Sequence, residues 1–178
     1  MYKDLSEVLI SEDQILEKVK ELGKQISLDY KDKNLLLISV LKGSFIFMAD
    51  LMRAIDVECA VDFMALSSYG SGVKTSGVVK ITKDLDMPIE NYDVLIVEDI
   101  LDSGLTLKYT LRLLSKRNPA SLKVCTLLDK PARRQADVRA DYKGFEIEDK
   151  FIVGYGLDYG EKYRNLKDIG VLKSEVYE

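Results

Sequence analysis

The apolar residues between Ser11 and Tyr30 recur at intervals of three and four positions, as they do on the buried face of an amphipathic helix. Ser11 and Gln14 have the spacing of a capping box, which marks the start of that helix. We therefore predict a helix over this segment, with a buried face made of Ile15, Leu16, Val19, Leu22 and Ile26.

A second pattern consists of short apolar runs, which is typical of strands buried on both faces. Such runs occupy residues 35–41, 57–66, 78–82, 93–98, 121–128 and 151–156. Helical patterns follow the turn at residues 42–44 and the loop after residue 98, ending near Ile55 and Lys116 respectively. Strands that alternate with helices predict an α/β fold, with a mostly parallel sheet and helices on both of its faces.

The composition is that of a globular protein, with 47% hydrophobic and 31% charged residues. We expect residues 1–178 to form a single domain, since the pattern shows no repeat and no linker. The longest apolar stretch, residues 35–40, is too short to span a bilayer, and the N-terminus lacks the apolar run of a signal peptide. We therefore predict a cytoplasmic protein without a membrane partner.

The charged residues exclude some functions and restrict the chemistry of others. The net charge is −4 and the basic residues are scattered, so we expect no nucleic-acid partner. The chain has no histidine, and a general base near neutral pH must therefore be a carboxylate, lysine, tyrosine or cysteine. Cys59 and Cys125 lie in apolar segments and are predicted to be buried, reduced thiols, although their spacing also permits a disulfide.

The segment VEDILDSGLT, residues 97–106, directly follows a buried strand and opens a helix. Ligands of open α/β sheets bind at this end of a strand. Residues 102–106 offer small side chains, hydroxyls and backbone N–H groups at a helix N-terminus, which suits a phosphate monoester. Glu98 and Asp99 would repel that phosphate and suit sugar hydroxyls and a hard cation instead. The alternative, a capped strand-to-helix turn without a ligand, explains the acidic residues less well.

This segment resembles the signature of phosphoribosyltransferases that binds phosphoribosyl pyrophosphate (PRPP). LKGS at 41–44, SSYGSG at 67–72, LLDKPARR at 127–134 and FIVGYGLDYGEKYRNL at 151–166 extend the resemblance to the hypoxanthine (hypoxanthine-guanine) branch over nearly the whole chain. The resemblance implies the type I phosphoribosyltransferase fold, which has a small hood subdomain and a flexible lid loop. It also implies transfer of the phosphoribosyl group to a 6-oxopurine base, Mg²⁺ as cofactor, and a homodimer or homotetramer.

At the PRPP loop, the resemblance assigns Glu98 and Asp99 to the ribose hydroxyls and magnesium. It assigns the 5-phosphate to Asp102, Ser103, Gly104, Leu105 and Thr106. Asp102 is also implied as the catalytic residue that accepts the proton from N7 of the purine. A helix N-cap is the alternative role for the Asp102 side chain.

For the purine, the resemblance implies that Lys130 donates to the exocyclic O6 and that Phe151 stacks on the base. A cationic donor at that position would oppose the amino group of adenine, which favours 6-oxopurines. The backbone at Ile152 and Asp158 is expected to contact the far edge of the base, and Asp158 to lie near a magnesium ion. Without the resemblance, Lys130 would be interpreted as a solvated lysine and Phe151 as a core residue.

For the pyrophosphate, the resemblance implies binding by five residues: Lys42, Gly43, Ser68, Tyr69 and Arg164. Lys42 and Gly43 correspond to a turn that contains a non-proline cis peptide in the family. Ser68 and Tyr69 lie in the glycine-rich loop 67–77, which is expected to close over the site and exclude water. The guanidinium of Arg164 suits bidentate binding of a phosphate, and Arg134 is a further candidate for supporting the base or phosphate pocket.

The sequence leaves other functions open. An enzyme of the same fold could use xanthine or a pyrimidine, and xanthine differs from the expected bases only at C2. A regulatory protein that senses PRPP and binds nucleic acid should show a basic face and an altered signature, whereas this chain is acidic with the signature intact. A nucleotide-binding module without turnover would not explain why Asp102, Lys130 and Arg164 occur together.

Overall fold

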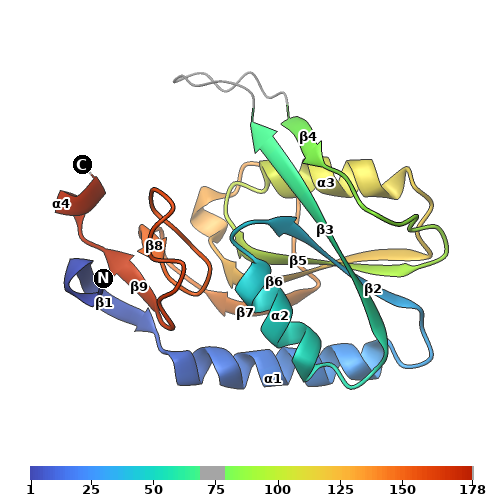
Figure 1. Cartoon of the computed structure of the whole chain (residues 1–178), viewed down its shortest axis with the longest axis horizontal. Helices are drawn as coiled ribbons and strands as arrows, with labels where there is room; N and C mark the ends of the chain where they lie inside the picture. Colours follow the sequence, from blue (N-terminus) through green and yellow to red (C-terminus); the bar gives the residue numbers. More distant parts are fainter. Residues whose placement is uncertain (69–78, 178) are drawn as a thin grey trace.

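The computed structural model describes residues 1–68 and 79–177 of the chain, and it contains two β-sheets. The larger sheet has six strands in the order β4-β3-β2-β5-β6-β7, and the smaller has three in the order β1-β9-β8 (Figure 1). The bounds of the larger sheet are β2 Leu35–Leu41, β3 Cys59–Ser68, β4 Val79–Lys83, β5 Asp93–Leu101, β6 Ser121–Asp129 and β7 Tyr142–Glu146. Those of the smaller sheet are β1 Leu5–Ile10, β8 Ile152–Val153 and β9 Ile169–Leu172.

The larger sheet is parallel except at one edge. β2 pairs in parallel with β3 and with β5, and β5-β6 and β6-β7 are also parallel pairs, whereas β4 runs antiparallel to β3. Because β2 and β5 are central, their side chains are buried on both faces, as their continuous apolar sequences require. The predicted mostly parallel α/β sheet is confirmed.

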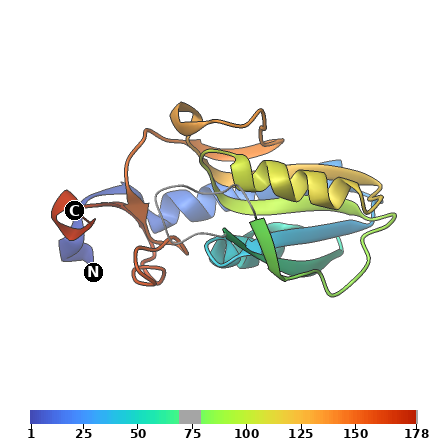
Figure 2. The same cartoon turned by 90° about the horizontal axis from the view of Figure 1, so that it is seen from above.

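Helices cover both faces of the larger sheet. α1 (Glu12–Asp29) and α2 (Phe45–Ala54) pack on one face and α3 (Leu105–Ser115) on the other (Figure 2). The predicted capping box is present at the start of α1, where Ser11 and Gln14 each accept a hydrogen bond from the other's backbone N–H. Leu16, predicted to be buried, is instead exposed because it lies at the margin of the apolar face.

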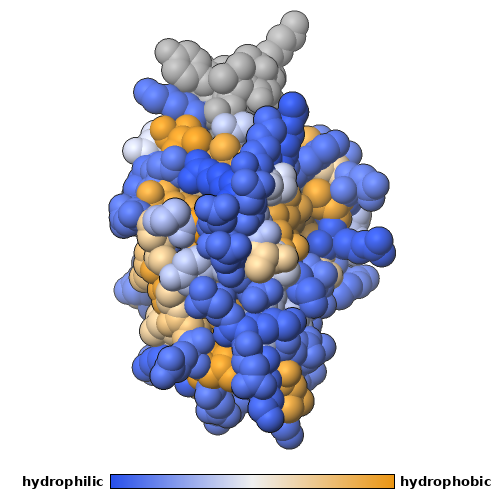
Figure 3. Space-filling model, turned by 90° about the vertical axis from the view of Figure 1, so that its right-hand side faces the viewer, coloured by the Kyte–Doolittle hydropathy of each residue, from blue (hydrophilic) through white to orange (hydrophobic). Residues whose placement is uncertain are grey.

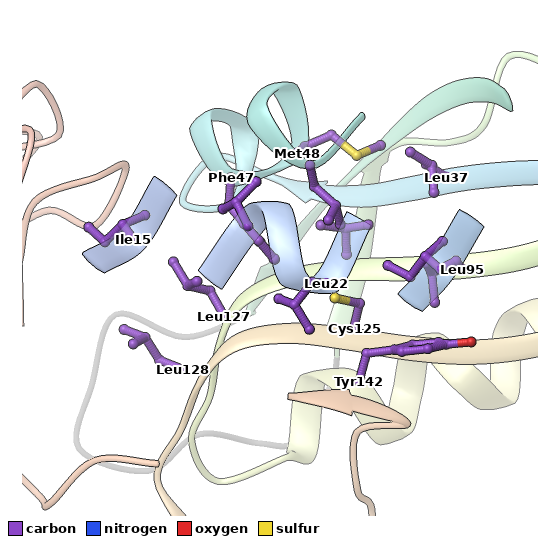
Figure 4. Close-up of a cluster of buried hydrophobic side chains, with 14 of the residues drawn as sticks. Ile15, Leu22, Leu37, Phe47, Met48, Leu95, Cys125, Leu127, Leu128 and Tyr142 are labelled. Carbon is purple, nitrogen blue, oxygen red and sulfur yellow. The ribbon is translucent and has the colours of Figure 1, made fainter. Parts of the chain in front are cut away.

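The main core lies between the larger sheet and the α1-α2 layer. Side chains from both helices meet those of β2, β5, β6 and β7 there (Figure 4). The residues labelled in that view are Ile15, Leu22, Leu37, Phe47, Met48, Leu95, Cys125, Leu127, Leu128 and Tyr142. This packing fixes the strands that carry the candidate site at their ends. Cys59 and Cys125 are free thiols as predicted, but only Cys125 is fully buried.

The smaller sheet brings the two ends of the chain together, and it corresponds in position to the expected hood. β1 pairs antiparallel with β9, and β9 with β8, so both termini lie at the same end of the molecule (Figures 1 and 2). The apolar patterns of residues 5–10 and 142–146 were not recognised as strands in the sequence, because both are short and mixed with charged residues. The predicted strand 151–156 is shorter than expected, since Gly154, Tyr155 and Gly156 have positive φ and turn the chain. The C-terminal segment adds a short helix, α4 (Ser174–Tyr177).

The end of the molecule opposite the smaller sheet is mostly hydrophilic, with apolar side chains in small, scattered groups (Figure 3). Within the described ranges 1–68 and 79–177, no helix combines the length and apolarity needed to cross a bilayer.

Candidate active site

The candidate site lies at the carboxyl edge of the larger sheet, on the side that faces the smaller sheet (Figure 1). β2, β5 and β6 run parallel, so the turns that follow them meet at this edge. β5 and β6 remain paired up to Leu101 and Asp129, which places the turn 101–104 beside the segment 129–134. The loop 154–164, which follows β8, reaches the same edge through Gly156.

Glu98 and Asp99 form the acidic part of this edge. The sequence predicted a loop after residue 98, but β5 continues to Leu101, so both carboxylates are held on a paired strand. Burial, and then the charge of Asp99, raise the pKa of Glu98 well above its usual value. Burial also raises the pKa of Asp99 to about 6, against the effect of the Ile100 N–H, which donates to Oδ1 at 2.8 Å. Both groups would be stabilised by a cation.

Residues 98–104, 106 and 107 line a cavity of about 220 Å³ at the start of α3. Gly104 is the N-cap, with φ of 78°, and a side chain there would collide with Val138. The alternative role of Asp102 as the N-cap is therefore wrong. The Ser103 hydroxyl accepts from the Leu105 N–H at 3.4 Å. The first turn of α3, with its backbone N–H groups, thus borders a cavity large enough to hold a phosphate group.

Asp102 is positioned by its own backbone and by two arginines. Its carbonyl accepts a hydrogen bond from Arg134 Nε at 2.9 Å, and Arg133 Nε lies 3.3 Å from Oδ1 of its carboxylate, an ion-pair contact without hydrogen-bond geometry. Within the described part of the chain, Asp102 Oδ1 therefore has no hydrogen-bond partner although it is shielded from solvent. A buried acceptor without a donor is costly, and it fits a group that receives a proton donor from a ligand.

Three turns meet at Gly43. A side chain on Gly43 would collide with the carboxylate of Asp99, and a side chain on Gly156 would collide with the Gly43 carbonyl. The peptide bond between Leu41 and Lys42 is cis, as the resemblance implied. The Lys42 ammonium is exposed and pairs with Glu161 at 3.1 Å. Glycine is therefore required at both positions for the β2 turn, β5 and the loop 154–164 to approach one another.

Arg164 closes the loop 154–164 on itself. Its Nη1 donates to the Gly156 carbonyl at 2.7 Å, and its Nη2 lies 2.9 Å from Asp158 Oδ1 and 3.4 Å from Glu161. Its Nε is buried and has no partner among residues 1–68 and 79–177. The side chain therefore retains an unused donor at a site where Asp99, Asp158 and Gly43 approach each other.

Lys130 and Phe151 are far apart in the chain, but the fold brings them together, because Lys130 bonds to Lys150, the residue directly before Phe151. The largely buried Lys130 donates to the carbonyl of Lys150 at 2.6 Å and lies 3.6 Å from Asp149. Phe151 follows directly in the chain and is 40% exposed, so it is not the core residue that its sequence type suggests. Ile152 pairs with Val171 in the smaller sheet. The fold thereby places the cationic donor of Lys130 close to the partly exposed ring of Phe151.

Some of the residues predicted for the site are not among those that the structure brings together at this edge of the sheet. Ser68 is the last residue of β3, whose end lies beyond the paired segment with β2. Tyr69 and most of the loop 67–77 lie outside the described residues. The described residues contain no group of three or more carboxylates or cysteines close enough to hold a metal ion. Mg²⁺ commonly uses one or two carboxylates together with substrate phosphates, so the pair Glu98 and Asp99 fits it in the presence of such a substrate.

Comparison with known proteins decides the family. A model of the phosphoribosyl transferase domain matches residues 10–160, which is most of the chain. The chain belongs to the phosphoribosyl transferase family. It is 56% identical to the hypoxanthine-guanine phosphoribosyltransferase of Bacillus subtilis, over 100% of this chain and 99% of the relative. It is 55% identical to the corresponding Staphylococcus epidermidis protein, over 99% of each.

Solved structures of this phosphoribosyl transferase family agree in fold. A hypoxanthine phosphoribosyltransferase from Staphylococcus aureus superposes with a TM-score of 0.97 at 53% identity, covering 100% of this chain and 97% of the other. A lysine-to-arginine mutant of the Trypanosoma cruzi enzyme, in a ternary substrates complex, gives a TM-score of 0.94 at 44% identity over 99% and 100% of the two chains. The expected type I phosphoribosyltransferase fold is thus confirmed.

The connections that hold the site together were missed in the sequence. Arg134, a candidate for supporting the pocket, donates to the carbonyls of Leu101 and Val138 as well as Asp102, and it pairs with Asp129. It therefore joins the turn after β5 to the segment after β6. Asp129 lies within the LLDKPARR segment but was not assigned a role, because its partner is known only from the fold.

A second missed connection anchors the loop 154–164. The Tyr155 hydroxyl donates to Asp50 of α2 at 2.6 Å, and the two residues are far apart in the chain. Nothing in the sequence indicates this contact, since tyrosine and aspartate at such positions are also common on surfaces.

Proposed function

We propose that this chain transfers the 5-phosphoribosyl group of PRPP to N9 of hypoxanthine, and of guanine, giving IMP or GMP and pyrophosphate in purine salvage. The observation that supports this most is the position of Asp102. Its carboxylate oxygen Oδ1, which has no hydrogen-bond partner among the described residues, lies between the cavity at α3 and the segment that carries Lys130. A proton acceptor between a phosphate site and a base site is what ribosyl transfer to a purine requires.

Binding of PRPP is assigned to two groups of residues. The 5-phosphate would bind at Asp102, Ser103, Gly104, Leu105 and Thr106, where α3 begins. The pyrophosphate would bind at Lys42, Gly43, Ser68, Tyr69 and Arg164, where the unused Nε of Arg164 is an available donor. Glu98, Asp99 and Asp158 would hold Mg²⁺ together with the ribose hydroxyls and pyrophosphate oxygens. When bound, the ion neutralises the negative charge of the leaving pyrophosphate.

Binding of the base is assigned to the segments around Lys130 and Phe151. Lys130 keeps two N–H donors besides the one directed to the Lys150 carbonyl, and one of them would bind O6 of the purine. Phe151 would stack on the base, with the backbone of Ile152 and Asp158 at its far edge. Adenine would place an amino group against the ammonium, which accounts for the expected preference for 6-oxopurines.

In the reaction, the lone pair of N9 forms a bond to C1 of the ribose as the bond from C1 to the pyrophosphate oxygen breaks, with inversion at C1. The proton at N7 of the purine passes to the carboxylate of Asp102, so the purine base of the product nucleotide carries no charge. Arg164 and Lys42 stabilise the charge on the departing oxygen. The fixed carbonyl of Asp102, held by Arg134, keeps the acceptor oriented throughout.

The direct test measures nucleotide formation from PRPP and Mg²⁺ with hypoxanthine, guanine, xanthine and adenine supplied separately. We expect IMP and GMP to form, little product with adenine, and loss of turnover when the metal is chelated. PRPP binding without turnover on any base would contradict the proposal and would favour a PRPP sensor. Turnover with xanthine alone would correct the substrate.

Three further properties accompany this proposal. The candidate site draws residues from β5, β6 and the strand after Phe151 in the smaller sheet, which supports residues 1–178 acting as one domain. A homodimer or homotetramer is tested by gel filtration with light scattering. A cytoplasmic location stays a prediction from the sequence.

A further inference from the structure

Three aromatic rings from distant segments form a cluster next to the residues proposed to bind the purine base. Phe151 stacks on Tyr177, with ring centroids 4.5 Å apart and planes at 18°. Tyr159 meets Phe151 edge-on, at 5.6 Å and 85°, and it also lies 6.5 Å from Tyr177. Tyr177 is the last residue of α4, and the family model does not extend to it. None of the roles assigned above involves Tyr177.

The position of α4 determines which face of Phe151 is covered. α4 lies on the side of β8 and β9 that is turned away from the larger sheet (Figure 1). Its Val176 and Tyr177 pack against a buried cluster of the smaller sheet, and the Lys173 N–H donates to the Asp4 carbonyl at 3.0 Å, just before the helix. Tyr177 therefore approaches Phe151 from a fixed support on the outer side.

Part of the Phe151 ring remains exposed. Phe151 is 40% exposed even though Tyr177 covers one face and Tyr159 contacts the ring. The carbonyl of the preceding residue, Lys150, accepts a hydrogen bond from Lys130, which directly follows β6 of the larger sheet. Tyr159 and Tyr177 are only 6.5 Å apart, too close for them to lie on opposite faces of the Phe151 ring, so Tyr159 does not cover the face opposite Tyr177. A ring supported on one face and open on the other is arranged to receive a second flat partner.

We propose that Tyr177 is a positioning residue for the purine: it holds the Phe151 ring at the angle at which the base stacks on the opposite face. The inference rests on the proposed function, since it needs the base to bind at Phe151. An exposed phenylalanine without support would sample several orientations and lose that freedom when the base binds. Tyr177 restricts the ring beforehand, so the base binds a ring that is already oriented.

The test replaces Tyr177 by Leu and by Phe. Leu retains the apolar packing of α4 on the smaller sheet but lacks a flat ring, whereas Phe retains the ring and loses only the hydroxyl. Val176→Ala is the matched control, because Val176 packs on the same cluster from the same helix. For each variant, KM for hypoxanthine and KM for PRPP are measured at saturation of the other substrate. Circular dichroism and gel filtration verify that fold and assembly are unchanged.

For Tyr177→Leu we expect KM for hypoxanthine to rise about five-fold, the size of one aromatic pair, with KM for PRPP unchanged. Tyr177→Phe and Val176→Ala should resemble the unmodified protein. An unchanged or lower KM for hypoxanthine in Tyr177→Leu would overturn the inference, as would an equal rise in Val176→Ala or in KM for PRPP. Absence of nucleotide formation by the unmodified protein would instead refute the proposed function itself.

Discussion

The two ends of the candidate site are built in different ways. The phosphate end, residues 98–106, is continuous in sequence and consists of the end of β5, one turn and the start of α3. The base end, made of Lys130, Phe151, Ile152 and Asp158, comes from separate segments that meet through the hydrogen bond from Lys130 to the Lys150 carbonyl and through the smaller sheet.

This difference determines what each end depends on. The phosphate end presents backbone N–H groups in a geometry set locally by Gly104 and by the pairing of β5 with β6. The base end relies on side chains whose positions are set by contacts over long sequence distances, such as the stacking of Phe151 on Tyr177. Substitutions at the phosphate end should therefore change kcat or the ionisation of the acidic pair. Substitutions at the base end should change the preference between purine bases.

The largest effect is expected for Asp102→Asn. The amide keeps the shape of the side chain but accepts a proton far less readily, so kcat should fall about 10²-fold or more. The dissociation constant for PRPP should change little, because the proposal assigns the 5-phosphate mainly to backbone N–H groups. Single-turnover kinetics and PRPP titration measure the two quantities. Weak PRPP binding with normal kcat at saturation would refute the assignment of Asp102 as the proton acceptor.

The second prediction concerns the connection between the two ends. Arg134→Met removes the donor to three carbonyls and one ion-pair partner of Asp129, leaving this mostly buried acid with Lys143 as its remaining ion-pair partner among the described residues. We expect a loss of about 3 kcal/mol in the free energy of unfolding, measured by urea denaturation. The matched control is Arg133→Met, since the side chains of Arg133 and of its ion-pair partners Asp102 and Asp149 are all 40% or more exposed. Equal effects of both variants would show that Arg134 does not join the two ends.

The phosphate end was largely predictable from the sequence, because its chemistry and its local structure are encoded in one segment. The buried strand before residue 98 and the helix after residue 104 were both recognised from their apolar patterns. The continuation of β5 through Asp99 to Leu101 was not, because the charged residues interrupt the apolar run and the strand persists only through pairing with β6. The choice of Gly104 as N-cap likewise depends on Val138, which lies far along the chain.

The base end shows where sequence patterns stop being informative. Phe151 and Lys130 have ordinary roles in most proteins, and only the family resemblance singled them out. The strand predicted for 151–156 was wrong beyond Val153, because the chain turns there with positive φ from Gly154 to Gly156, where Gly154 approaches the Asp168 carbonyl and Gly156 the Gly43 carbonyl. Tyr177 could not have been found, since its contact with Phe151 exists only once β8, β9 and α4 are assembled.

The third prediction uses the raised pKa of Asp99. A carboxyl group whose pKa is about 6 in the folded state and about 3.9 when unfolded binds its proton more tightly in the folded protein. Its ionisation therefore lowers stability progressively as the pH rises from about 4 to above 6. Asp99→Asn cannot ionise, so in metal-free buffer at pH 7.5 it should be more stable by on the order of 2 kcal/mol.

The gain from Asp99→Asn should shrink towards zero at pH 4.5, where the carboxyl of the unmodified protein is mostly protonated when folded. Urea midpoints at the two pH values measure this difference. Asp137→Asn, at an exposed position in the segment after β6, serves as the control and should change stability little at either pH. A loss of stability in Asp99→Asn at pH 7.5 would contradict the view that the buried charge of Asp99 destabilises the metal-free protein.

The smallest effect is expected at the base end, for Lys130→Met. Methionine fills the largely buried position of Lys130 but cannot donate to O6, so kcat/KM for hypoxanthine should fall about tenfold, or ~1.4 kcal/mol. Because the proposed binding mode also sets the ammonium against the amino group of adenine, its removal should leave kcat/KM for adenine unchanged or higher. The ratio between the two bases, measured in parallel assays, is therefore the informative quantity.

Lys143→Met is the matched control for Lys130→Met, since Lys143 is a more exposed lysine that pairs with Asp129 and Glu146 rather than with the base end. It should leave the ratio of hypoxanthine to adenine use unchanged. If Lys130→Met lowered kcat for both bases equally and left their ratio intact, Lys130 would be acting on the whole site through Asp149 and Arg133. Selectivity would then arise from the backbone near Ile152, and the two ends of the site would be less separate than their construction indicates.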